Sequence, residues 1–430
     1  MLVFTDVITP RIQYIFQYLG EKTGITFRLT ESLEHYKTEA APTFNYSSNV
    51  ISSGEFHIMP CGLLTETGIK QREISLHTQN NFPVFFTTGG VFGFDLPAAI
   101  FYLISRYEEY DTFTPDEYGR YPYQDSLANK GGFLQRPLVD EWVNLFAKKI
   151  SDYYPTIITK IPEFELIPTY DIDIAWSYLH KGWLRNIGGA FKYPGTTPER
   201  LRVLTGAQKD PFDCYDQLDE WHEKMNCKPI YFFPVGTKRT SRDKHISPHN
   251  PSYRKLIQRI SQKADVGLHP SLYSNDHPAS LSDEKKILED IIGKPIHQSR
   301  QHYLWLKLPI TYRTLINTGI TDDYSMGYGT INGFRASTSR SFIWYDLEKE
   351  QITSLRIHPL AWMDANSCYE QKLTPEEAAD EFICYQQFIQ KVKGKLIAVS
   401  HNHLIGKQTF WKGWGAYYQK ILSNGSSGQT

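Results

Sequence analysis

Residues 165–173 read ELIPTYDID, a short β-rich run that ends in two acidic residues. Similar runs alternate with helical patterns from Phe164 onward, and we expect strands at Glu165–Thr169, Pro229–Phe233, Asp265–Leu268, Ile296–Ser299, Thr318–Thr321, Ser354–Ile357 and Lys395–Val399. Alternating strands and helices indicate a parallel sheet. About seven strands over roughly 260 residues favour a closed or nearly closed (β/α) barrel, whose chemistry lies at the carboxyl ends of the strands.

Helix-end signals support this alternation. Asp213 precedes a run with apolar residues every three or four positions, and Ser282 begins a helix with acidic residues in its first turn. Thr374-Pro-Glu-Glu377 is a capping box with proline at the first helical position, and we expect that helix to stop at Gly394.

The chain divides into two predicted domains and a tail. Residues 1–160 indicate a smaller mixed α/β accessory domain, with one helix opened by Asp95-Leu-Pro97 and another near Val139–Ile150. Residues 161–422 form the predicted barrel. The tail, residues 423–430, is rich in Ser and Gly, and we expect it to be disordered.

Composition narrows the classes of function. The 430 residues include 46 basic and 47 acidic side chains, a formal charge of −1, which argues against nucleic-acid binding. We find neither an apolar run long enough to cross a bilayer nor a signal peptide. Five cysteines without CxxC spacing fit a reducing compartment, so we expect a cytoplasmic protein. Aromatic residues make up 14% of the chain, which weakly favours a sugar ligand.

Residues suited to chemistry follow the predicted strands. Asp171 and Asp173 are two positions apart, so they share one face of an extended strand and repel each other unless a cation or a proton intervenes. A capping or turn pair is the alternative. His269, Arg300 and His401 follow the third, fourth and seventh predicted strands, and each has a structural role as its alternative.

The order of these motifs resembles the polysaccharide deacetylase family (carbohydrate esterase family 4), in its divergent members with D-x-D in the first motif. The resemblance spans about residues 164–422 and rests on TYDID at 169–173, GLHPS at 267–271, RQHY at 300–303, DDYSMGY at 322–328, GFRAST at 333–338, IHPLAWMD at 357–364 and LIAVSHN at 396–402.

The resemblance implies a distorted (β/α)7 barrel that hydrolyses N- or O-linked acetyl groups on sugars with a divalent metal, often zinc. By position, Asp171 would be the general base and Arg300 would orient it. Asp173 and His269 would bind the metal, and His401 would be the general acid. Such a metal polarises the carbonyl and activates water, and the base and acid move protons.

The second motif departs from the family pattern H-x-x-x-H, because Tyr273 stands four residues after His269. The usual third ligand is therefore missing. Either another residue replaces it, or the metal binds weakly, or the site is inactive. Among replacements we expect His302 first, with His403 and His358 as the next choices.

Aromatic and polar residues near these motifs are candidates for binding substrate. The resemblance implies that the amide of Tyr303 lies where an oxyanion is stabilised. We expect Tyr324 and His358 to bind substrate as well. Three tryptophans follow strands and could either form the base of a sugar-binding groove or pack in the core: Trp176, Trp305 and Trp362.

The leading hypothesis is a metal-dependent deacetylase that acts on a carbohydrate, namely a precursor of a surface polysaccharide. An inactive deacetylase-like barrel that binds carbohydrate or serves as a scaffold is the alternative. Hydrolysis of a non-sugar amide is a third hypothesis.

Overall fold

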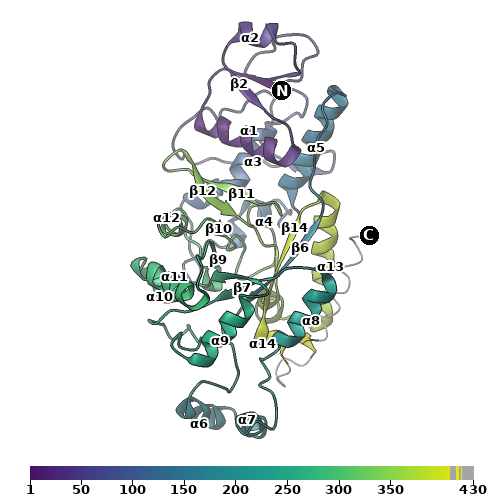
Figure 1. Cartoon of the computed structure of the whole chain (residues 1–430). Helices are drawn as coiled ribbons and strands as arrows, with labels where there is room; N and C mark the ends of the chain where they lie inside the picture. Colours follow the sequence, from purple (N-terminus) through teal and green to yellow (C-terminus); the bar gives the residue numbers. More distant parts are fainter. Residues whose placement is uncertain (407–412, 416–417, 419–430) are drawn as a thin grey trace.

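A large, mainly parallel sheet organises the second part of the chain (Figure 1). The computed structural model describes residues 1–406, 413–415 and 418. Within these residues nine strands pair in the order β11-β12-β10-β9-β8-β7-β6-β14-β13. Their bounds are β6 Glu165–Asp171, β7 Ile230–Phe233, β8 Asp265–Leu268, β9 Gln298–Ser299, β10 Asp322–Asp323, β11 Phe342–Asp346, β12 Gln351–Ile357, β13 Trp362–Met363 and β14 Lys395–His401.

The first and last long strands of the large sheet are neighbours. The last long strand, β14, pairs in parallel with the first, β6, from Lys395 opposite Glu165 to His401 opposite Asp171. The other parallel neighbours follow chain order, and only β11 runs antiparallel to its neighbour, β12. Among the described residues no ladder joins β12 to β13. The mixed α/β class with a large sheet is confirmed, and closure into a barrel stays a prediction.

Two local predictions are wrong. The strand expected at Thr318–Thr321 lies later, as β10, because Thr318 caps α12 (Ile310–Asn317) and Gly319 turns the chain at φ 75°. The helix expected to begin at Ser282 begins three residues earlier, as α11 (Ala279–Ile292), directly after Pro278. The capping box at Thr374 is confirmed, since its hydroxyl accepts from the Glu377 amide and the Glu377 carboxylate accepts from the Thr374 amide.

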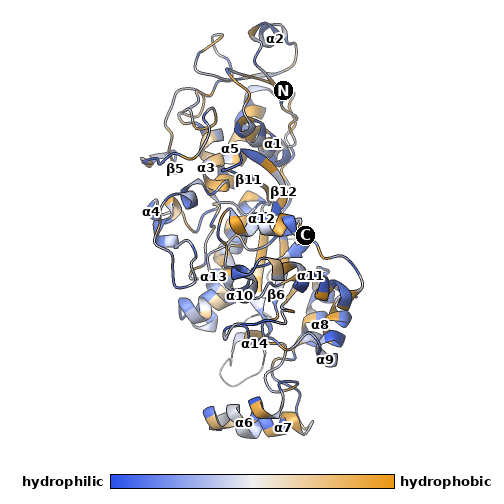
Figure 2. Ribbon diagram, turned by 90° about the vertical axis from the view of Figure 1, so that its left-hand side faces the viewer, coloured by the Kyte–Doolittle hydropathy of each residue, from blue (hydrophilic) through white to orange (hydrophobic). Residues whose placement is uncertain are grey.

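Helices lie around the sheet in Figure 1. They include α8 Tyr215–Met225, α9 Pro251–Ile260, α10 Leu272–Asp276, α13 Pro375–Val392 and α14 Asn402–Ile405. Two further helices, α6 (Trp183–Lys192) and α7 (Thr197–Leu204), project from the lower end of the molecule in Figures 1 and 2. None of the helices in the described part of the chain has the length and apolar composition of a bilayer-spanning segment. The predicted disordered tail, residues 423–430, lies outside the described residues.

The N-terminal region has its own small parallel sheet, in which β1 (Leu2–Thr5) lies between β2 (Arg28–Thr30) and β3 (Thr43–Tyr46). The remaining elements of this region are α1 Pro10–Thr23, α2 Leu33–Thr38, β4 His77–Gln79, β5 Phe82–Val84, α3 Leu96–Ile104, α4 Leu127–Lys130 and α5 Leu138–Tyr153. The prediction that Asp95 caps a helix is confirmed, because its carboxylate accepts from the Ala98 amide at the start of α3.

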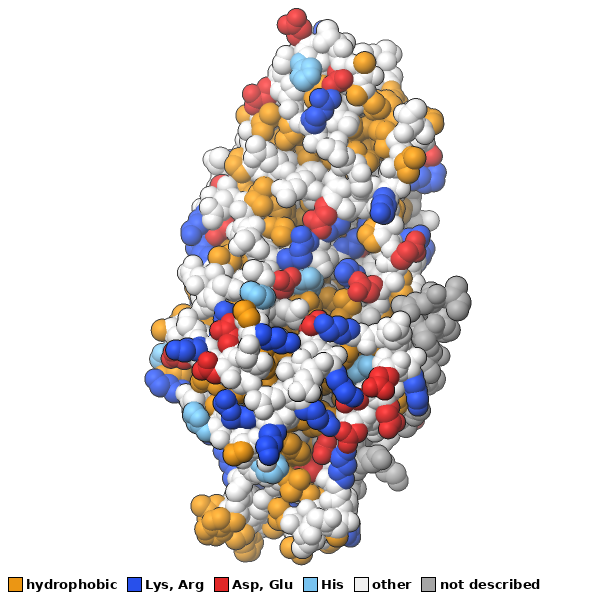
Figure 3. All heavy atoms as spheres, in the orientation of Figure 1, with side chains coloured by type: hydrophobic (Ala, Val, Ile, Leu, Met, Phe, Trp, Pro, Cys, Tyr) orange, Lys and Arg blue, Asp and Glu red, His pale blue; other side chains and the backbone are white. Residues whose placement is uncertain are grey.

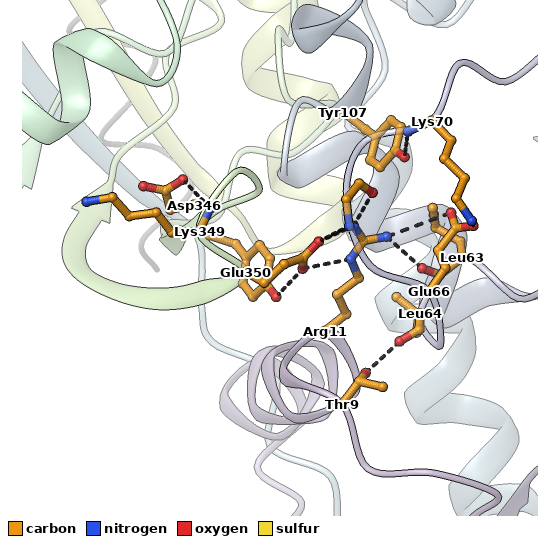
Figure 4. A network of polar contacts seen from close by, with 12 residues as sticks. Thr9, Arg11, Leu63, Leu64, Glu66, Lys70, Tyr107, Asp346, Lys349 and Glu350 are labelled. Carbon is orange, nitrogen blue, oxygen red and sulfur yellow. Dashed lines mark hydrogen bonds and ion pairs between the residues drawn. The ribbon is translucent and has the colours of Figure 1, made fainter.

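One hydrophobic core continues from the N-terminal region into the large sheet. Tyr14 of α1 packs against Phe101 of α3 and against Tyr345 of β11. Beside this contact, the buried guanidinium of Arg11 donates to both carboxylate oxygens of Glu350, which follows β11 (Figure 4). The two parts of the chain are therefore packed together through buried apolar and charged contacts.

Candidate metal centre and active-site cleft

A cleft of about 870 Å³ opens beside the carboxyl ends of β6, β8 and β14. Strand pairing fixes this arrangement, because parallel neighbours end at the same edge of the sheet. The lining includes most of the predicted site residues: Asp171, Asp173, His269, His302, Tyr303 and His401. Arg300 is fully buried directly behind it.

Three side chains converge as a candidate metal centre. Asp173 Oδ1 lies 3.1 Å from His269 Nε2 and 3.5 Å from His302 Nε2. One ligand atom from each residue falls within 4.8 Å of the others. Tetrahedral zinc with bonds of about 2.1 Å separates its ligands by about 3.4 Å, which matches these spacings. Asp173 Oδ1 is buried and accepts no hydrogen bond from the described residues, so the donor set fits a cation.

Neighbouring groups orient both imidazoles. His269 Nδ1 donates to the Arg300 carbonyl oxygen at 2.6 Å, and His302 Nδ1 lies 3.2 Å from Asp243 Oδ1. Asp243 is itself held by the backbone amides of Thr240 and Leu272. With Nδ1 engaged in this way, each ring turns Nε2 toward Asp173, an arrangement typical of metal-binding histidines.

The electrostatics of this cluster favour ionised groups. Burial alone would raise the pKa of the Asp173 carboxyl, but the facing imidazoles of His302 and His269 hold it well below its usual range. Burial alone would lower the pKa of His302, and the carboxylates of Asp173 and Asp243 overcome this effect and raise it to about 9. A carboxylate and a positive charge therefore stabilise each other in the cleft.

Asp171 is held by Arg300. The Arg300 Nη1 atom donates to Asp171 Oδ1 at 2.8 Å, and its Nε donates to the Tyr324 carbonyl oxygen at 3.1 Å. The guanidinium also lies 4.4 Å from the centre of the Phe232 ring. These contacts fix the guanidinium, so one oxygen of Asp171 is oriented and the other stays available to the cleft.

His401 ends β14 on the other side of the cluster. Its Nδ1 donates to Asp364 Oδ1 at 2.6 Å, and its backbone amide donates to Asp364 Oδ2 at 2.7 Å. Its Nε2 lies 3.7 Å from Asp173 Oδ2. Burial lowers the pKa of His401, but the Asp364 carboxylate outweighs it and raises the pKa to about 9. The ring is thus held with Nε2 toward the cleft.

The N-terminal region reaches the cleft through Arg120, which lines it, and through Tyr118, which packs against Tyr303. Tyr303 has a left-handed backbone (φ 58°), which is rare for an aromatic residue and marks a constrained loop. Arg120 Nη1 donates to the Tyr303 carbonyl oxygen at 2.6 Å, and the rings of Tyr118 and Tyr303 stack with centroids 5.1 Å apart. The Trp305 indole donates to the Tyr118 carbonyl oxygen. The first part of the chain therefore supports the loop that carries His302.

Several predicted residues lie outside the cleft lining. Tyr324 and His358 stack on each other with ring centroids 4.3 Å apart, and His358 Nε2 lies 2.8 Å from Asp322 Oδ1. Tyr273, which stands four residues after His269, packs against the His277 ring with centroids 4.1 Å apart. The tryptophans proposed as a sugar floor also lie outside the lining: Trp176, Trp305 and Trp362.

Sequence reasoning missed Asp243, Asp364 and Arg120. Asp364 directly follows β13, a strand of two residues that gives no periodic signal, although it stands at the end of the quoted IHPLAWMD motif. Asp243 and Arg120 come from irregular loops, and no pattern in the sequence singles them out. His403, which was a candidate ligand, lines the cleft, and its Nε2 lies 2.9 Å from the Tyr369 hydroxyl.

Comparison with known proteins yields one family and several structures. A family model described as a family of unknown function (DUF7033) matches residues 1–155. No curated protein sequence matches the chain. A solved structure from Mycobacterium smegmatis, described as a polysaccharide deacetylase, is 14% identical, with a TM-score of 0.42 over 62% of this chain and 85% of its own.

Two other solved structures share lower similarity. The polysaccharide deacetylase Bc1974 from Bacillus cereus is 13% identical, with a TM-score of 0.30 over 61% of this chain and 88% of its own. IcaB from Ammonifex degensii is 12% identical, with a TM-score of 0.24 over 39% of this chain and 85% of its own. The chain is thus similar in part to solved structures described as polysaccharide deacetylases, and its first 155 residues match a family of unknown function.

Proposed function

We propose that the protein is a metal-dependent hydrolase that removes N- or O-linked acetyl groups from a carbohydrate. The observation that carries the proposal is the convergence of Asp173, His269 and His302 on one spot in a large cleft, beside Asp171 and His401. This combination supplies a cation site, a base and an acid within one cavity, which are the groups that hydrolysis of an amide or ester requires.

Asp173, His269 and His302 would hold the metal. One carboxylate and two imidazoles suit zinc and leave coordination positions open. The chemistry that these residues would gain from a bound divalent cation is polarisation of an acetyl carbonyl and a lower pKa of bound water. Asp243 and the Arg300 carbonyl would keep the two imidazoles oriented for this task.

Asp171 would act as the base and His401 as the acid. Arg300 binds one oxygen of Asp171, so the carboxylate stays oriented while it takes a proton from the attacking water. His401, positioned by Asp364, presents Nε2 from the opposite side and would give a proton to the departing amine or alcohol. The backbone amide of Tyr303 would stabilise the negative charge that develops on the carbonyl oxygen.

A carbohydrate substrate is supported by the size and lining of the cleft. Its volume of about 870 Å³ is enough for an oligosaccharide segment, and four tyrosines are among the residues that line it: Tyr178, Tyr193, Tyr303 and Tyr369. Tyrosine rings offer flat apolar faces to sugar rings and hydroxyls to their oxygens.

Acetate release tests the proposal. Zinc-loaded protein should release acetate from N-acetylated or O-acetylated oligosaccharides, and Asp171→Asn should reduce the rate by about 10²–10⁴-fold, the usual contribution of a general base. His297→Ala, which alters an exposed histidine, should leave the rate unchanged. Failure to release acetate from any acetylated sugar, or an unaffected Asp171→Asn variant, would contradict the proposal.

A carbohydrate-binding protein without catalysis is the second candidate. It is favoured by Tyr273, which stands four residues after His269 and packs against His277, so the only candidate ligands among the described residues at this spot are Asp173, His269 and His302. This candidate predicts that acetylated oligosaccharides bind equally well after chelator treatment and in Asp171→Asn, and that no acetate is released. Turnover lost in Asp171→Asn would exclude it.

A further inference from the structure

The α6–α7 hairpin carries a concentration of exposed apolar side chains. Of the fifteen large hydrophobic residues that are exposed in the described structure, seven lie within residues 183–204. Trp183 is 70% exposed, Leu184 68% and Phe191 85%. The hairpin projects alone at the lower end of Figures 1 and 2, and Figure 3 shows apolar side chains gathered at that end.

These side chains form one face of α6. Successive residues of a helix are about 100° apart, so Trp183, Leu184, Ile187 and Phe191 fall within an arc of about 100°. Lys192 falls on the opposite side of the same helix. The helix is therefore amphipathic, but its apolar face contacts no core and is open to solvent.

The hairpin is also strongly basic. Residues 181–206 contain five basic side chains and one acidic side chain, Glu199, which gives a formal charge of +4 in a chain whose total is −1. Within the described part of the chain, none of the five forms an ion pair with a carboxylate: Lys181, Arg185, Lys192, Arg200 and Arg202. Arg200 is buried against Asn186, and Lys181 lines the cleft close to Asp210. Arg185, Lys192 and Arg202 are exposed, so three positive charges lie on the surface of the hairpin.

Internal contacts hold the two helices together. Arg200 Nη1 donates to Asn186 Oδ1 at 2.8 Å, and its guanidinium lies 4.6 Å from the centre of the Tyr178 ring. Gly189 permits this approach, since a Cβ there would lie 2.7 Å from Arg200 Nη2. The inner side of the hairpin, including Lys181, lines the cleft. The exposed face is therefore a fixed surface beside the opening of the cleft.

Charge decides between the candidate partners for this surface. A second copy would bring two hairpins of charge +4 against each other, which opposes self-association. In an anionic lipid bilayer, Trp, Leu and Phe side chains can insert among the acyl chains, and Lys and Arg can pair with the negative headgroups. Amphipathic helices that lie in the membrane interface use this combination.

We propose that the α6–α7 hairpin docks the protein onto an anionic lipid bilayer, with its apolar face in the interface and its exposed basic residues, Arg185, Lys192 and Arg202, near the headgroups. The cleft then opens at the bilayer surface, where it meets a substrate that is carried on or near the membrane. This docking is independent of whether the site hydrolyses acetyl groups, because the surface that binds lipid lies outside the candidate catalytic residues.

Vesicle sedimentation tests the docking. The full chain should sediment with vesicles of three parts phosphatidylcholine to one part phosphatidylglycerol, and weakly with pure phosphatidylcholine. The double variant Trp183→Ser/Phe191→Ser should bind the anionic vesicles at least about tenfold more weakly. The matched control Val50→Ser/Ile158→Ser changes two residues that are 65% and 87% exposed elsewhere, and should bind like the unaltered protein.

A second variant tests the charge. Lys192→Glu/Arg202→Glu, at two exposed residues outside the cleft lining, should also weaken binding, as should about 0.5 M salt. Absence of vesicle binding, or equal binding by the Trp183→Ser/Phe191→Ser variant, would overturn the proposal. A dimer in solution that this variant converts to a monomer would overturn it in favour of a second copy.

Discussion

Replacement of Glu109 by Gln tests whether the N-terminal region and the large sheet are held together by buried charge. Glu109 follows α3, and its carboxylate accepts from Arg335 Nε at 2.8 Å and Nη2 at 2.7 Å, and from Arg106 Nε at 2.7 Å. All three side chains are almost fully buried. Burial raises the pKa of Glu109, but Arg335 and Arg106 lower it below its usual range, so the group is ionised in the folded protein.

The expected loss of stability follows from what the substitution leaves behind. Gln keeps the shape of Glu109 but removes its charge, and Arg335 then has no acidic partner among the described residues. Arg106 keeps Glu108, whose Oε1 lies 2.8 Å from its Nη2. Removing one partner of a buried ion pair costs about 3–5 kcal/mol, and the remaining Glu108 contact places the expected loss at the lower end, about 3 kcal/mol.

Equilibrium urea unfolding followed by circular dichroism measures this loss. Glu163→Gln is the matched control, because Glu163 pairs with Lys393 at 3.0 Å on the surface and should change the free energy of unfolding by less than about 1 kcal/mol. A loss below about 1 kcal/mol in Glu109→Gln would refute the reasoning, since the buried cluster would then contribute no more than an exposed pair.

Three further variants test separate parts of the structure. Burial raises the pKa of Glu284 from 4.5 to about 7, so the folded state keeps a proton that the unfolded chain releases. Stability should therefore fall by up to about 3 kcal/mol as the pH rises from 4.5 to 7, and urea unfolding of Glu284→Gln at several pH values should lack this fall. Gly189→Ala should open the hairpin to limited proteolysis because its Cβ would displace the Arg200 guanidinium from Asn186, whereas Gly188→Ala, with no atom within 4 Å, should resist cleavage. Arg120→Ala removes a donor to the Tyr303 carbonyl oxygen in the loop that carries His302, and should lower kcat for acetate release about tenfold.

The sequence was most informative where strands end in polar residues. Asp171 and His401 lie opposite each other at the ends of paired strands, as the motif order predicts, and His269 follows β8. The alternation of side chains along a strand can be read from a short stretch of sequence. Parallel neighbouring strands end at the same edge of a sheet. The part of the cleft formed by β6, β8 and β14 could therefore be predicted without coordinates.

The rest of the site depends on long-range geometry. Tyr324 and His358 follow β10 and β12, which stand several strands away from β6 in the sheet, so their position after a strand does not bring them into the cleft. Asp243 and Arg120 reach the site from loops whose paths are set by tertiary packing. The roles given to the site residues, including His302 as the third ligand, remain proposals.

Zinc titration by isothermal calorimetry tests the central claim most directly. Chelator-treated protein should bind one equivalent of zinc, and His302→Ala should weaken binding by at least about tenfold, while His297→Ala should bind like the unaltered protein. If the unaltered protein takes up no zinc, or if His302→Ala binds it with unchanged affinity, Asp173, His269 and His302 do not form the metal centre.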